Sequence, residues 1–309
     1  MILSVSRRTD IPAFYSDWFY NRIKAGYVCV RNPMNRHQVN RIKLTPDLID
    51  CIVFWSKNPK PMLHRLDELK DYMYYFQFTI NPYNQELETF VPVKESIIDT
   101  FKCLSDTIGP KRVIWRYDPI LFTRNIDIGY HLKYFEAIAK RLAPYTQMCV
   151  ISFVDQYKKT QRNLKDTTAR ELQLDEMTIL AIGLVAIASK YEIKIQSCAE
   201  QIELEQIGIM HGRCIDNILI EDLLGVKLFV SKDKNQRLEC GCVQSIDIGE
   251  YNTCPHNCRY CYANFNKELV LENRIRHDPT SPLLIGNIQN NDIVKDRVIQ
   301  SFKLKSSLF

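Results

Sequence analysis

Short apolar runs alternate with amphipathic stretches along the first two-thirds of the chain. The apolar runs predict strands over residues 2–6, 52–55, 74–80, 113–116, 149–153 and 193–197. The stretches between them repeat apolar residues every three or four positions and predict helices over residues 12–25, from 61, around 93–104, and over 128–142, 172–189 and 218–224. Gly26 is expected to end the first helix, and residues 27–31 predict a short extra strand.

This alternation predicts a parallel sheet, because strands separated by helical crossovers cannot pair as hairpins. Six such units can form an open doubly wound sheet or a partial barrel. The chain has only ten glycines and lacks the glycine-rich phosphate-binding motifs G-x-G-x-x-G and G-x-x-x-x-G-K-[ST], which disfavours dinucleotide-binding folds. We therefore predict an α/β fold with a partial (βα)6 TIM-like barrel over residues 1–224. A cysteine-rich cluster-binding segment, residues 225–309, is expected to pack on the barrel mouth.

Composition narrows the class of protein. The chain has 309 residues, 46% of them hydrophobic, which excludes general disorder. Its longest strongly apolar run, residues 177–188, is shorter than the ~20 residues that cross a bilayer, so no membrane association is expected. The first residues lack the apolar segment of a secretory signal, which predicts a cytoplasmic protein. A net charge of +5 is too small to indicate nucleic acid as a partner.

The eleven cysteines point to metal chemistry, because their number is odd and nothing indicates export to an oxidising compartment. Cys254, Cys258 and Cys261 have the spacing C-x3-C-x2-C, which would arise by chance about one or two times in a hundred. Three thiolates on one loop can hold three irons of a 4Fe-4S cluster and leave the fourth iron open. The alternative is a zinc site completed by His256 or a further cysteine. We otherwise expect His256 to be a surface residue or a neighbour of the ligands.

With Tyr260 directly before its last cysteine and Tyr262-Ala263-Asn264 after it, this loop resembles the signature loop of the radical S-adenosylmethionine (radical SAM) superfamily. The resemblance implies that S-adenosylmethionine binds the open iron. One electron from the cluster would then cleave S-adenosylmethionine to methionine and a 5′-deoxyadenosyl radical, which abstracts a hydrogen atom from a substrate. It also implies an electron donor such as a ferredoxin or flavodoxin.

The whole chain further resembles a bacterial family of unknown function, through the opening residues 4–12 and the C-terminal cysteines. Two features depart from typical radical SAM enzymes. The cysteine loop follows the six strand-helix units instead of the first strand, so we expect a permuted loop that folds back over the barrel mouth. Residues 55–59 stand where a Gly-Gly-Glu element usually follows the second strand. The residues expected to bind the cofactor are Arg7, Lys57, Asn58 and Tyr260.

A second set of thiols comes from three separate segments: Cys198, Cys214, Cys240 and Cys242. Four thiolates can hold an auxiliary 4Fe-4S cluster, which we favour, or a structural zinc ion. They can also be ordinary buried cysteines, because no C-x2-C pair is present. The other cysteines lie among apolar neighbours and are expected to be core thiols: Cys29, Cys51, Cys103 and Cys149.

Polar residues follow the predicted strands, where parallel sheets bind their ligands. They are Ser6, Arg7, Arg8, Asp10, Ser56, Lys57, Asn58, Thr79, Asn81, Arg116, Asp118, Ser152, Asp155, Cys198 and Glu200. We predict Arg116, Asp118 and Glu200 as catalytic. Arg7, Arg8, Lys57 and Arg116 would favour an anionic small-molecule substrate, or else pair with these carboxylates in a buried ion network. The segment 158–171 is expected to be a solvated surface connection, with a lid as the alternative.

Two other functional classes remain open. One is a non-catalytic iron-sulfur or zinc protein whose cysteines hold a module that binds a partner or nucleic acid. The other is a hydrolase or lyase that uses Arg116 and Asp118, with a purely structural metal.

Overall fold

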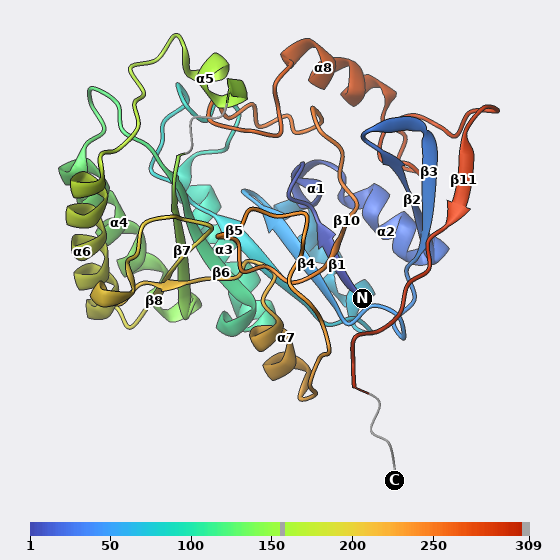
Figure 1. The fold of residues 1–309 in the computed structure, drawn as a ribbon, viewed down its shortest axis with the longest axis horizontal. Coiled ribbons are helices and arrows are strands. Elements are labelled where there is room, and N and C mark those ends of the chain that lie inside the picture. Colours follow the sequence, from blue (N-terminus) through green and yellow to red (C-terminus); the bar gives the residue numbers. More distant parts are fainter. Residues whose placement is uncertain (155–157, 305–309) are drawn as a thin grey trace.

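The computed structural model describes residues 1–154 and 158–304. Its main sheet has eight strands in the order β10-β1-β4-β5-β6-β7-β8-β9, and every neighbouring pair is parallel (Figure 1). These strands are β1 (Ile2–Val5), β4 (Cys51–Ser56), β5 (Tyr74–Thr79), β6 (Val113–Ile120), β7 (Met148–Phe153), β8 (Lys194–Ser197), β9 (Met210–His211) and β10 (Ile246–Asp247).

The predicted parallel α/β fold is confirmed, and the six predicted strands lie side by side in chain order from β1 to β8. Two strands of two residues each, β9 and β10, extend the sheet at its edges. A two-residue strand has no hydrophobic period, so the pattern did not predict them. Within residues 1–154 and 158–304 no pairing joins β9 to β10, and the sheet is therefore open in the region described.

Eight α-helices occur in the described part of the chain: α1 (Ile11–Phe14), α2 (Ser16–Ala25), α3 (Lys94–Ile108), α4 (Ile128–Leu142), α5 (Lys158–Leu164), α6 (Leu174–Lys190), α7 (Asn217–Leu224) and α8 (Lys267–Arg276). A 3-10 helix, η1 (Lys60–Leu69), follows β4, and shorter 3-10 turns are η2 (Pro110–Arg112), η3 (Ala143–Tyr145) and η4 (Glu205–Ile207). In the part of the chain that the structure describes, no helix combines the length and apolarity needed to span a bilayer.

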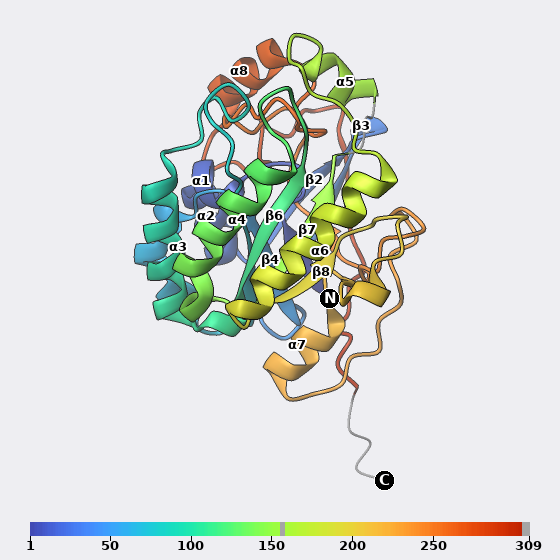
Figure 2. The same ribbon diagram turned by 90° about the vertical axis from the view of Figure 1, so that its left-hand side faces the viewer.

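Both faces of the main sheet are buried, because residues that alternate along each strand enter two different apolar clusters. Phe54 and Phe76 face the cluster that packs under the helices, and Figure 2 shows α3, α4 and α6 on that side. Val53 and Tyr75 face the opposite cluster, which is covered by chain from the last third of the protein, including Cys214. Burial on both faces explains why the strands read as almost continuous apolar runs.

A separate three-stranded sheet stands beside α2, with the order β11-β3-β2. Its strands are β2 (Tyr27–Asn32), β3 (Asn35–Lys43) and β11 (Ile293–Asp296). β2 matches the predicted extra strand, and β3 was not predicted because most of its side chains are polar and exposed. The predicted domain boundary at residue 224 coincides with the end of α7, and residues beyond it add one strand to each sheet.

Three local expectations were wrong. The first predicted helix is two helices, because the backbone of Tyr15 leaves the helical conformation between α1 and α2. The segment 158–171, expected to be a solvated loop that connects two elements at the surface, contains helix α5. Cys103 is exposed, because it lies on the side of α3 away from the buried Phe101 and Leu104.

His131 lies fully buried on α4, and we expect it to make the free energy of unfolding depend on pH. Its Nε2 lies 3.0 Å from the Leu121 carbonyl oxygen, and its Nδ1 lies 2.8 Å from the Tyr117 hydroxyl. Burial lowers its pKa to about 4, although the Leu121 carbonyl opposes this shift. The unfolded chain therefore binds this proton first as the pH falls, so stability is lost between about pH 6.5 and pH 4.

We expect the wild type to lose about 3 kcal/mol from this group between pH 7 and pH 4, and His131→Gln to remove that slope. Urea unfolding at both pH values measures the difference between the two proteins. The exposed His64→Gln serves as the matched control and should keep the wild-type slope. Equal slopes in all three proteins would contradict the assignment.

Candidate functional site

The C-terminal cysteine loop reaches the carboxyl ends of the strands through β10, which runs parallel beside β1. At the end of β10, the Asp247 carboxylate accepts hydrogen bonds from Ser4 Oγ at 2.8 Å, Ser6 Oγ at 2.7 Å and the Arg7 backbone N–H at 2.8 Å. A Cβ at Gly249 would lie 2.0 Å from Ser6 Oγ, so only glycine fits this crossing. Figures 1 and 2 both show α8, which follows the loop, at the same end of the sheet as α5.

The three loop cysteines lie at this end, with Cys258 buried and Cys254 and Cys261 half-buried. The Cys261 N–H donates to the Cys258 carbonyl at 3.1 Å, which closes a tight turn. Cys258 also forms an antiparallel bridge with Glu88, from the loop after β5. Burial raises the pKa of all three thiols, that of Cys258 to about 12 although the Lys57 ammonium opposes the rise.

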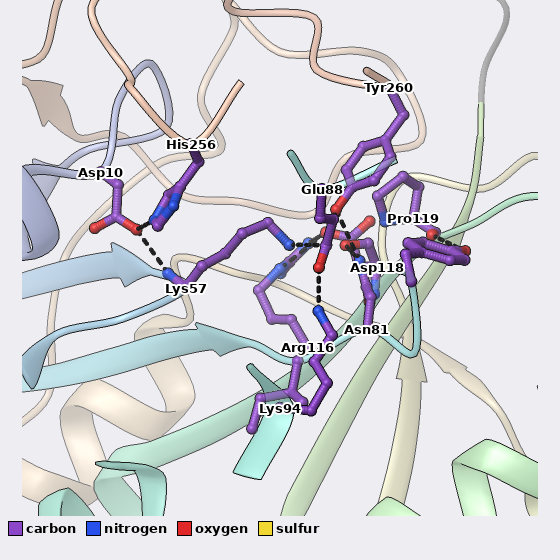
Figure 3. A network of polar contacts seen from close by, with 12 residues as sticks. Asp10, Lys57, Asn81, Glu88, Lys94, Arg116, Asp118, Pro119, His256 and Tyr260 are labelled. Carbon is purple, nitrogen blue, oxygen red and sulfur yellow. Dashed lines mark hydrogen bonds and ion pairs between the residues drawn. The ribbon is translucent and has the colours of Figure 1, made fainter. Parts of the chain in front are cut away.

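Glu88 is the centre of a buried ion network beside the loop (Figure 3). Its carboxylate accepts from Lys57 Nζ at 2.7 Å, from Lys94 Nζ and from the Tyr260 hydroxyl. Burial raises the pKa of Glu88, but Lys57 and Lys94 outweigh burial and hold it at about 2. A carboxylate shared by two ammonium groups keeps one net positive charge within this network, next to Cys258.

Asp10 ties the loop to the ends of β1 and β4. Its carboxylate accepts from Ser56 Oγ and from the Lys57 backbone N–H, both at 2.7 Å, and lies 2.9 Å from His256 Nε2. His256 is buried, not at the surface, and this contact directs its Nε2 toward Asp10. His256 lies in the loop between Cys254 and Cys258, and Asp10 fixes the orientation of its ring.

Several buried polar atoms around the loop lack a hydrogen-bond partner within the described chain: Thr9 Oγ1, His256 Nδ1 and Asn264 Oδ1. Leaving such an atom unpaired costs about 1–3 kcal/mol, so their gathering at one place fits a bound group that would supply partners.

On its outer side the loop is joined to α5, because Asn163 Nδ2 donates to the carbonyl oxygens of Cys261 at 3.3 Å and Asn264 at 2.8 Å.

Arg116 and Asp118 connect this network to the second set of thiols. Asn81 Nδ2 donates to the Asp118 carbonyl at 2.8 Å and contacts the Tyr260 hydroxyl at 3.3 Å. Arg116 Nε donates to Asp118 Oδ2 at 3.0 Å, and its Nη1 donates to Cys214 Sγ at 2.7 Å. The predicted catalytic pair is thus an ion pair, with Arg116 buried and Asp118 half-buried, that lies between the two groups of cysteines.

The structure brings the second set of thiols together on the sheet face away from the helices. Cys198 Sγ lies 3.0 Å from Cys214 Sγ. Cys242 Sγ accepts a hydrogen bond from the Ile215 N–H at 3.4 Å, and the nearby Cys214 and Cys240 thiols lower its pKa. As arranged in the described residues, no three His, Cys, Asp or Glu side chains could hold one metal ion.

The sequence comparison identifies the family. A family model described as a domain of unknown function, DUF1848, matches residues 2–263. The chain belongs to the DUF1848 family. No curated protein matches this DUF1848 chain.

Among solved structures, this DUF1848 chain is similar to a protein described as "a putative alpha-L-fucosidase from Bacteroides thetaiotaomicron VPI-5482". The two are 12% identical, the match covers 59% of this chain and 75% of the other, and the TM-score is 0.25. With an identity and a TM-score this low, the match indicates neither a shared fold nor a shared activity.

Among the other predicted residues of the DUF1848 chain, Arg7 contacts the cysteine loop through its carbonyl oxygen, which accepts from the Tyr262 hydroxyl at 2.7 Å. The Glu200 carboxylate accepts from the Phe153 N–H at 2.9 Å at the end of β7. The Arg7 guanidinium points to Ser245 Oγ at 3.1 Å, on the side of Cys242. Asn58 is half-buried, and its backbone N–H donates to Ser56 Oγ. Asp155 lies outside the described residues.

Sequence reasoning missed Glu88 and Lys94 as members of the DUF1848 site. Glu88 lies in a polar stretch after β5, far from any recognisable motif, and Lys94 begins α3. The usable signal was their position, because both follow the carboxyl end of a predicted strand.

Proposed function

We propose that the protein is a radical SAM-type iron-sulfur enzyme whose 4Fe-4S cluster is held by Cys254, Cys258 and Cys261. The observation that carries this proposal is the position of the three-thiol loop over the carboxyl ends of parallel strands, where sheets of this kind bind ligands. We further propose that the six strands from β1 to β8 form the wall of a partial TIM-like barrel around the reaction site.

The donor set suits a cubane better than a single ion. A cubane carries each thiolate on a different iron, so its ligands stand further apart than those around one zinc ion. Among the described residues no hydrogen bond joins the thiols of the loop cysteines, although their charges affect one another's pKa. When bound, the cluster would supply the electron that cleaves S-adenosylmethionine to methionine and a 5′-deoxyadenosyl radical.

The residues beside the loop would bind and orient the anionic parts of the reactants. The surplus positive charge of Lys57 and Lys94 over Glu88 favours an anion next to Cys258. The Tyr260 ring lies 5.5 Å from Lys57 Nζ, and its hydroxyl is held by Glu88, which keeps this ammonium in position. We propose that Lys57 orients the cofactor carboxylate.

A cavity of about 270 Å³ adjoins the residues that immediately precede Cys254. Arg8, Arg36 and Glu250 line it, together with Arg31, which is paired with Asp292. Arginines bind carboxylates and phosphates through paired hydrogen bonds. We propose this cavity for an anionic small-molecule substrate. The contacts of Asn163 with the loop would let α5 limit the access of water from outside.

The test is anaerobic purification of the full chain, followed by iron and sulfide analysis and reduction in the presence of S-adenosylmethionine. We expect about four irons and four sulfides per chain and the release of 5′-deoxyadenosine with an equal amount of methionine. An iron-sulfur cluster that releases no 5′-deoxyadenosine would favour a non-catalytic protein. A chain without iron after reconstitution would overturn the proposal.

A further inference from the structure

Four thiols lie together between the main sheet and the segment that leads to β10, and no step of the proposed reaction uses them. We propose that they bind one zinc ion as a tetrathiolate site, separate from the three-cysteine loop: Cys198, Cys214, Cys240 and Cys242. This inference does not rest on the proposed function, because it concerns another group of residues on another part of the sheet.

The chain is shaped to bring these thiols together from three segments. Cys198 follows β8, Cys214 follows β9, and Cys240 and Cys242 lie between α7 and β10. Gly241 makes the approach possible, since a Cβ there would lie 2.9 Å from Arg213 Cγ and 3.1 Å from the Gly212 carbonyl.

A second glycine supports the same approach. A Cβ at Gly212 would lie 2.8 Å from Gln196 Cβ and 2.9 Å from the Ser197 carbonyl oxygen. Gly212 and Gly241 therefore allow β8, β9 and the segment 240–242 to pack closely against one another.

The distances favour a single ion over a second cubane. Cys198 Sγ and Cys214 Sγ are 3.0 Å apart. Cys242 Sγ lies beside the next residue of the same segment, Ile215, and Cys240 belongs to the same buried cluster. A zinc-sulfur bond of about 2.3 Å implies a sulfur-sulfur edge of about 3.8 Å in a tetrahedron. Cys198 Sγ and Cys214 Sγ lie closer than this edge, and moving them apart by less than about 1 Å would give the spacing that zinc requires. A cubane would have to force the same thiols much further apart.

The surroundings suit the negative charge of a zinc tetrathiolate. Arg116 Nη1 donates to Cys214 Sγ at 2.7 Å, and the Ile215 N–H donates to Cys242 Sγ at 3.4 Å. The Tyr75 hydroxyl and Gln77 Nε2 both donate to the Cys214 carbonyl, which fixes the backbone of this ligand against β5. Donors of this kind orient metal ligands and are part of such sites.

The experiment measures zinc and iron in the full-length protein and in a variant with all three loop cysteines replaced by alanine. We expect about one zinc per chain in both proteins, with iron lost only from the loop variant. Cys214→Ala should lose the zinc, while Cys149→Ala, a cysteine buried on the helical face, should retain it. X-ray absorption at the zinc edge should report four sulfur neighbours at about 2.3 Å.

Three results would overturn the site: iron and sulfide retained by the loop variant, a metal-free folded protein with four free thiols, or a Cys198–Cys214 disulfide detected by mass spectrometry. The zinc-edge spectrum of the wild type decides the question even if Cys214→Ala fails to fold. If the protein lacked iron or did not cleave S-adenosylmethionine, the zinc measurement would be unchanged. A failure of the proposed function can therefore be told apart from a failure of the zinc site.

Discussion

Cys258→Ala is expected to remove both the iron and the S-adenosylmethionine cleavage of the reconstituted protein. Each loop thiolate would hold one iron, and two remaining thiolates cannot retain a cubane with an open corner. We expect iron to fall from about four to less than one per chain, and 5′-deoxyadenosine to fall to the background of the protein without cluster. Iron analysis and chromatography of the quenched reaction measure the two effects.

Cys149→Ala is the matched control, because this thiol is equally buried but lies in the core under the helices. It should keep the iron content and activity, although it loses some stability through the cavity it leaves. If Cys258→Ala kept the wild-type iron content, the three-cysteine loop would not be the cluster ligand. If Cys149→Ala lost iron equally, the loss would reflect general unfolding.

Glu88→Ala is expected to have the largest effect on stability, because it leaves two ammonium groups beside the loop without their carboxylate. Lys57 and Lys94 are mostly buried, and removing one partner from a buried ion pair costs about 3–5 kcal/mol. The pKa of Glu88 near 2 gives a similar value of about 3 kcal/mol, which is fully present above about pH 4.5 and lost as the pH falls through 2. Urea unfolding at pH 7 measures the change in the free energy of unfolding.

Two further variants give this prediction its controls. Glu86→Ala removes an exposed carboxylate from the same loop and should change the free energy of unfolding by less than about 0.5 kcal/mol. Glu88→Gln keeps the shape and an acceptor for Tyr260 but no charge, so it should lose most of the same stability. If Glu88→Ala lowered the free energy of unfolding as little as Glu86→Ala does, the two lysines would have found water or other partners, and the prediction would be wrong.

The six central strands were predictable because a strand buried on both faces must be apolar along its whole length, as in β4 and β7. The same reasoning failed where burial does not set the residue type. β3 is mostly exposed, and its pairing with β2 and β11 rests on backbone hydrogen bonds that leave little trace in composition. Cys103 shows the limit of judging burial from neighbours, because a helix turns successive residues to different environments.

At the candidate site, spacing along the chain identified the cysteine loop, since its three thiols are local in sequence. Glu88 could not be identified this way, because two of its three partners, Lys57 and Tyr260, come from distant segments, and only Lys94 is close to it in sequence. The role of His256 was equally hidden, since only the crossing of β10 beside β1 brings it to Asp10.

The order of apolar and polar residues by itself determined that this chain forms a parallel α/β sheet with a cysteine loop near its C-terminus, because periodicity and local spacing act over neighbouring residues. Only the tertiary structure decided that this loop meets Glu88 and Asp10, and that four thiols from three segments lie in one cluster. The contacts of the loop with Glu88 and Asp10 join residues more than a hundred positions apart, and those among the four thiols join separate segments, so neither could be inferred from local spacing.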